Sequence, residues 1–291
     1  MRKNILEGST STISLESHMD RLALEANIIT NAISNLQGIV PKLTEKFNNA
    51  INGLFDSKSH SAVENLHKAS GDVAAIAKLV PYNSFATYDR TLVTSPEGLE
   101  GDFMTYVLAL ISVSREVYIT ADQSLSTLQQ QLATFITNSE VKASNKDKTL
   151  DYKKAAKQRE AITKEIGRFF SDKNSRSKMY MSEAINNFNE IDELYKKTKT
   201  LIDINNKTNI EAIERKTKEV NNLLSMVYED MKNNPDTKVS GAAAKNIAEG
   251  AYETAKCVEL VGIFNFRVSQ IYACIYELVT QLKKIMSTNK K

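Results

Sequence analysis

Histidines and the acidic residues near them are the first places to look for chemistry in this chain of 291 residues. Of its three histidines, His18 and His60 stand at predicted helix ends with no partner motif nearby. His67 follows Glu64 by three residues, which on a helix places both side chains on one face. Di-iron bundles use such a pair twice, together with two more glutamates. No second Glu-x-x-His occurs here, so we expect no metal site.

Motifs for catalysis or cofactor binding are absent from the sequence. It contains no Gly-x-Gly-x-x-Gly, no Walker A loop, no Cys-x-x-Cys and no His-Glu-x-x-His. Its two cysteines, Cys257 and Cys274, lie in one helical pattern that separates them by about 25 Å, too far for a disulfide. They are predicted to be buried free thiols. We therefore expect a protein that is not an enzyme and uses no cofactor.

Positive charge is concentrated in residues 142–178, which hold twelve Lys and Arg against five Asp and Glu. The net charge of the whole chain is only +3, too small by itself to imply nucleic-acid binding. In a predicted helix over 152–170, four basic residues fall within about 60° of each other. They are Lys153, Lys157, Lys164 and Arg168. This stripe predicts weak contact with nucleic-acid phosphates and no sequence readout, since no aromatic residues are interleaved to stack bases.

The basic stripe has a second interpretation as an ordinary solvated helix face. Glu160 lies in the same stripe, at helical spacing from Lys157 and Lys164. Ion pairs at such spacings are common on exposed helices and stabilise them slightly. Under this interpretation the lysines bind nothing.

The dipeptide Leu-Glu recurs three times in the first 26 residues. The copies are Ile5-Leu6-Glu7-Gly8, Ser14-Leu15-Glu16-Ser17 and Ala23-Leu24-Glu25-Ala26. In each copy a small or aliphatic residue and one spacer precede Glu, and a small residue follows. Alternatively, Glu16 and Glu25 are first-turn charges of an amphipathic helix. A further copy, Gly98-Leu99-Glu100-Gly101, lacks the aliphatic residue.

These tetrapeptides resemble the cleavage sites of prohead proteases in large tailed phages, which cut after Glu in a short aliphatic/small-x-Glu motif. Internal head proteins of such phages are often helical, carry an N-terminal targeting peptide that is removed during maturation, and are packaged with DNA. The resemblance covers residues 1–26 and the general helical, Asn/Lys-rich character of the chain. It implies cleavage between Glu7 and Gly8 or between Glu16 and Ser17. It also implies a place in the virion interior or the host cytoplasm, with DNA and capsid or other virion proteins as partners.

Helical periodicity covers most of the chain, because apolar residues repeat in alternating steps of three and four. The stripes predict about seven helices, over 15–54, 63–80, 107–135, 152–170, 181–202, 213–231 and 240–287. Pro41 should kink or split the first of them. Residues 81–101 have no period and are the longest predicted loop.

The last predicted helix is apolar on most faces between 257 and 275, which places it at the centre of a bundle. The fold class is therefore all-α, an elongated antiparallel helical bundle with heptad-like packing. We expect a mobile segment over 1–16 and one helical domain over 17–291, with a hinge at 138–151. Heptad stripes serve packing within a chain and between chains equally, so they predict no particular oligomeric state.

The two most apolar stretches, 103–113 and 257–279, are too short or too interrupted by charges to predict a stable membrane span. The N-terminus has no apolar segment like that of a secretory signal. The favoured hypothesis is a non-enzymatic phage virion protein packaged with DNA. The alternatives are a cytosolic coiled-coil adaptor or scaffold that binds partner helices, and a helical pore-forming or membrane-acting protein.

Overall fold

The fold is all-α, and seven helices lie in the part of the chain that the computed structural model describes. That part comprises residues 32–54, 64–65, 68–69, 71–73, 90–96, 98–139, 142, 152–169, 178–234 and 239–288. The helices are α2 (Ala32–Leu54), α6 (Phe103–Thr137), α8 (Tyr152–Gly167), α9 (Met181–Ala184), α10 (Glu190–Ile204), α11 (Lys207–Asn233) and α12 (Gly241–Thr288). Two short strands, β1 (Leu92–Thr94) and β2 (Lys178–Tyr180), accompany them.

The chain groups into two compact units, and several long helices contribute to both. The first unit contains Met1–Ile51, Thr120–Lys157 and Ile213–Val258. The second unit contains Asn52–Ile119, Gln158–Ala212 and Glu259–Lys291. Each unit is described by itself below.

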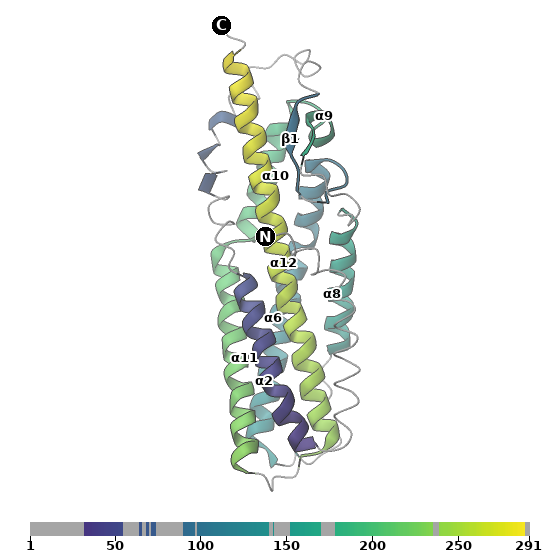
Figure 1. Cartoon of the computed structure of the whole chain (residues 1–291), viewed down its shortest axis with the longest axis vertical. Coiled ribbons are helices and arrows are strands. Elements are labelled where there is room, and N and C mark those ends of the chain that lie inside the picture. The colour runs from purple at the N-terminus through teal and green to yellow at the C-terminus, as the bar shows by residue number, and fades with distance from the viewer. Residues whose placement is uncertain are drawn as a thin grey trace, which may run out of the picture. The chain divides into compact units, whose positions relative to one another are not determined.

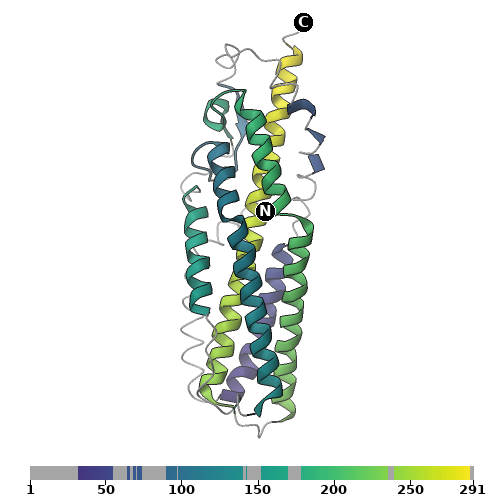
Figure 2. The same ribbon diagram turned by 180° about the vertical axis from the view of Figure 1, so that it is seen from behind.

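In the first unit, α6 and α11 lie side by side and run in the same direction (Figure 2). Lys216 of α11 donates a hydrogen bond to Asp122 of α6, and Gln129 of α6 donates to Glu219 of α11 at 3.1 Å. Residue numbers therefore rise together along both helices. A parallel pair is possible because a long segment, and not a tight turn, joins the two helices. By contrast, α11 and α12 are consecutive and run antiparallel (Figure 1).

The part of α12 in the first unit is buried on all sides. The eight consecutive residues Ala251–Val258 are all buried, which is more than two turns of helix. The two charged residues among them are paired: the Lys256 ammonium lies 3.6 Å from the Glu253 carboxylate and 4.3 Å from the centre of the Tyr252 ring. This confirms the central position expected for the last helix. The start of that helix is also as expected, because the Ala243 amide donates to the Ser240 hydroxyl at 3.0 Å.

The first predicted helix is described only from Ala32, and most of the second, over 63–80, lies outside the described residues. Within α2 the helix continues through Pro41 and is not split there. Pro41 is on the exposed face, where water can bond to the carbonyl that loses its N–H partner.

In the second unit, the helix expected over 181–202 is interrupted and forms α9 and α10 instead. Asparagines compete for the backbone bonds at the interruption. The Asn187 side chain accepts from the Glu190 amide at 3.2 Å, which begins α10. The Glu190 carboxylate in turn accepts from the Asn186 amide at 2.6 Å.

The strands β1 and β2 form a small antiparallel sheet in the second unit, which the sequence analysis missed. β1 lies in the predicted loop over 81–101, and three residues are too few to show a period of two. Val93 and Met179 pair on the buried face, whereas Leu92 and Tyr180 pair on the outer face and are each 50% exposed.

Two described helices are long and apolar enough to cross a membrane, by length and composition alone. They are α6 and the Gly241–Lys284 part of α12. The most apolar windows of these helices are 50% and 67% buried inside the protein, as core helices also are.

Val261 tests the packing around α12 in the second unit. Its side chain is fully buried, so Val261→Asp places an unpaired carboxylate in a dry interior and should lower the free energy of unfolding by about 3–5 kcal/mol. Ala273→Asp on the exposed side of the same helix is the control and should cost about 1 kcal/mol or less. Urea unfolding measures both variants, and equal losses would contradict the assigned core.

Alkaline pH should destabilise the second unit, because burial raises the pKa of Tyr106, Tyr118 and Tyr272 above the ordinary value of 10.0 and that of Cys274 from 9.0 to about 12. Well below pH 9 these groups are neutral in both states, and their burial then costs no stability. Above it the unfolded chain ionises first, so stability falls as pH rises. Thermal unfolding followed from about pH 8 to about pH 11 should show a falling Tm. A Tm that stays constant through pH 11 would refute this.

Candidate nucleic-acid interface

The four basic residues singled out in the sequence are all exposed, and all lie on α8 or in the turn that ends it. They form two pairs with a spacing of four residues, so each pair shares one helix face. Lys153 and Lys157 belong to the first unit, and Lys164 and Arg168 belong to the second. The buried residues of α8 are Ile162 and Ile166, as the apolar stripe predicted.

Contacts at each end of α8 hold the helix in place. In the first unit, the Tyr152 hydroxyl donates to the Glu249 carboxylate of α12. In the second unit, the carbonyl of Phe169 accepts from the Glu100 amide at 2.8 Å, and the Phe169 ring lies 6.2 Å from the ring of Tyr106. These contacts direct the aromatic residues at the ends of α8 inward, so the outward pairs present only cations.

Glu160 does not form the ion pairs with Lys157 and Lys164 that the solvated-face interpretation included. Glu160 lies 3.7 Å from Arg159, and within the described part of the chain no carboxylate comes within 4.0 Å of the amines of Lys153, Lys157 or Lys164. Arg168 does form an ion pair, with Glu165 at 2.6 Å. Three of the four cations are therefore available to an external anion.

The helix dipole also favours the binding of an anion at the start of α8. The first turn of α8 contains no acidic residue and carries Lys153, close to the end where unpaired backbone N–H groups already give positive partial charge. A cation there costs about 0.3–1 kcal/mol. A bound phosphate would relieve that repulsion and accept from the lysines at the same time.

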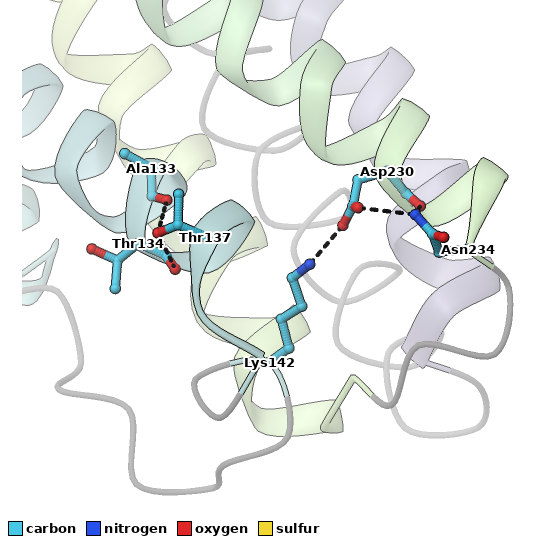
Figure 3. A network of polar contacts seen from close by, with 6 residues as sticks. All are labelled: Ala133, Thr134, Thr137, Lys142, Asp230 and Asn234. Carbon is cyan, nitrogen blue, oxygen red and sulfur yellow. Dashed lines mark hydrogen bonds and ion pairs between the residues drawn. The ribbon is translucent and has the colours of Figure 1, made fainter.

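Lys142 is a residue whose role the sequence analysis missed. It lies in the segment 138–151, where the sequence predicts a hinge, yet it is only 7% exposed. Its ammonium lies 2.7 Å from the Asp230 carboxylate near the end of α11 (Figure 3). Its carbonyl accepts from the Ser240 amide at 2.7 Å. These two contacts join the segment after α6 to α11 and α12 within the first unit. The proposed hinge over 138–151 otherwise lies mostly outside the described residues.

The residues of the predicted processing sites, Glu7, Gly8, Glu16 and Ser17, lie outside the described residues. The further Leu-Glu copy, Gly98-Leu99-Glu100-Gly101, lies within the described residues. Leu99 is 5% exposed, and the Glu100 amide is bonded to Phe169. The flanking Gly98 and Gly101 have positive φ angles of 75° and 103°, which shape a tight turn. This copy is therefore held in folded structure and is not an extended peptide.

The described residues contain no group of three or more His, Cys, Asp or Glu side chains that could hold a metal ion. Of the Glu64–His67 pair only Glu64 is described, so that pair stays a sequence observation. Both cysteines are buried free thiols, as expected, and the Ser124 hydroxyl lies 3.6 Å from the Cys257 sulfur.

Comparison with known proteins adds no relative: no family model, curated protein or solved structure matches this chain.

The basic pairs of α8 predict weak binding to duplex DNA that depends on salt. Changing all four residues to Gln should weaken binding at low salt about tenfold or more and reduce the slope of affinity against salt, because fewer counterions are released. A control removes three lysines and one arginine elsewhere on the surface: Lys42→Gln, Lys199→Gln, Arg215→Gln and Lys232→Gln. Gel shifts across a salt series compare the two. Equal losses, or binding that prefers one sequence, would contradict the assignment to α8.

Proposed function

We propose that the protein is a non-enzymatic component of a phage virion, packaged with the DNA in the head and in weak, non-specific contact with DNA phosphates. The observation that carries the DNA contact is the pair Lys153 and Lys157 at the start of α8, exposed and without a carboxylate partner in the described part of the chain. The three Leu-Glu tetrapeptides before residue 27 support the virion location by their resemblance to prohead-protease sites.

Non-specific contact suits a packaged protein. Phosphate contacts position a protein on DNA and carry no sequence information, so they allow binding anywhere along a genome. α8 presents cations and no exposed aromatic residue among its described positions, which fits contact with the backbone and not with the bases.

A protein-binding scaffold is the second candidate, and one observation favours it. Leu92 and Tyr180 form an adjacent pair on the outer face of the β1–β2 sheet, each 50% exposed. Such a pair is suited to contact with a partner protein. The form of the adaptor hypothesis that needs an exposed heptad seam has less support, because the described apolar stripe of α11 is buried throughout.

Proteolytic processing tests the virion proposal directly. We expect the protein in mature phage particles to begin at Gly8 or Ser17, because residues 1–14 have no apolar period and should enter a protease as an extended chain. Mass spectrometry of the particle protein, read at its N-terminus, decides this. The bond after Glu100 provides an internal control and should stay intact, since Leu99 is buried.

The double variant Glu7→Gln, Glu16→Gln should be packaged without losing those N-terminal residues. Particles in which the wild-type protein still begins at Met1 or Arg2 would remove the main support for the virion proposal. The scaffold hypothesis would then lead.

A further inference from the structure

A row of three hydrogen-bonded polar side chains, two of them buried, lies in the second unit and ends at the junction between α10 and α11. The Tyr118 hydroxyl of α6 lies 3.0 Å from the Asn265 side-chain oxygen of α12. It also contacts the side-chain oxygen of Asn205, the residue that ends α10. Tyr118 is 9% exposed and Asn265 only 3%, so these groups exchange few bonds with water.

Asparagine side chains supply several of the hydrogen bonds at the junction, in addition to the helical backbone bonds from the Asn205 amide to the Leu201 carbonyl at 2.9 Å and from the Ile210 amide to the Asn206 carbonyl at 3.3 Å. The Asn206 amide donates to the Asp203 carbonyl at 2.7 Å, and its oxygen accepts from the backbone N–H of Asn209 at 2.9 Å. The Asn209 side chain donates to the Ile204 carbonyl at 2.7 Å. The last carbonyls of α10 and the first amide groups of α11 are therefore bonded locally. Within the described part of the chain, Asn205 is the one side chain of residues 205–210 that hydrogen-bonds to a helix other than α10 and α11.

The number of hydrogens available on each group decides which of these three side chains donates and which accepts. A phenol hydroxyl has one hydrogen, so Tyr118 can donate to only one of the two asparagine oxygens. The Asn265 side-chain nitrogen is buried and has no hydrogen-bond partner among the described residues. Turning the Asn265 amide by 180° places that nitrogen against the Tyr118 oxygen, and such turns are assigned from the bonding network. Asn265 then donates to Tyr118, and Tyr118 donates to Asn205.

We infer that Asn265, Tyr118 and Asn205 form a latch that holds the α10–α11 junction closed. In this latch Asn265 donates a hydrogen bond to Tyr118, and Tyr118 donates one to Asn205. While Tyr118 donates to Asn205, the junction is fixed to the buried faces of α6 and α12. When that bond is lost, the residues from Asn205 to Ile210 open locally, while the bundle around them stays folded. The break between α10 and α11 is thus a hinge whose opening is set by one buried hydroxyl.

Amide hydrogen exchange on the full chain tests the latch. Tyr118→Phe removes the hydroxyl and keeps the ring, so exchange over Asn205–Ile210 should become about tenfold faster. Exchange over Ala251–Val258 should stay unchanged. Tyr106→Phe is the control, because it removes another buried hydroxyl of α6 that lies about three helical turns away from Tyr118 and outside the junction. Unchanged exchange at the junction in Tyr118→Phe, or an equal increase along the whole chain, would overturn the inference.

Two substitutions at Asn205 test the direction. Asn205→Asp keeps an acceptor for the Tyr118 hydroxyl and should retain slow exchange at the junction. Asn205→Leu has a similar size and no acceptor, and should match the fast exchange of Tyr118→Phe. If both variants exchange alike, Tyr118 does not donate to residue 205 and the latch has no such direction.

Discussion

The need to cover α12 on every side over Ala251–Val258 is the constraint on which the rest of the structure depends. A helix with apolar residues all round cannot be stable in water alone, since each buried aliphatic side chain contributes about 1.5–3 kcal/mol only when neighbours exclude water. In the first unit, the continuous burial of Ala251–Val258 requires helices on several sides. Each of those helices offers one apolar stripe and keeps its polar side outward, as α11 does. The amphipathic pattern of the other helices follows from the pattern of α12.

The long periodic elements could be predicted from the sequence because their signal extends over many turns. The stripe of α11 and the start of α12 at Ser240 were expected and confirmed. The interruption between α9 and α10 was not, because it depends on asparagine side chains that compete with the backbone over only a few residues. The pairing of β1 with β2 joins segments far apart in the chain, and a pattern read along the sequence does not show such a contact.

The exposure of the basic residues on α8 could be predicted from the sequence, and their ion pairing could not. Periodicity alone placed Lys157 and Lys164 on one exposed face of α8, and the structure shows both of them exposed. Which carboxylate pairs with which cation depends on rotamers, and Glu160 lies near Arg159 instead of either lysine. For Lys142, by contrast, the sequence predicted neither the burial of the side chain nor its partner. Nothing in a polar surface-like segment indicates that one lysine in it will find a buried carboxylate.

The order of the helices along the chain, with α12 after α2, α6 and α11, has a consequence for biosynthesis. A ribosome releases α2, α6 and α11 before the helix that covers their apolar stripes exists, and α6 must wait for partners about 90 residues away in α11. Synthesis at about 5–20 residues per second leaves those stripes uncovered for several seconds. The nascent chain is therefore open to chaperones and to self-association until α12 has emerged.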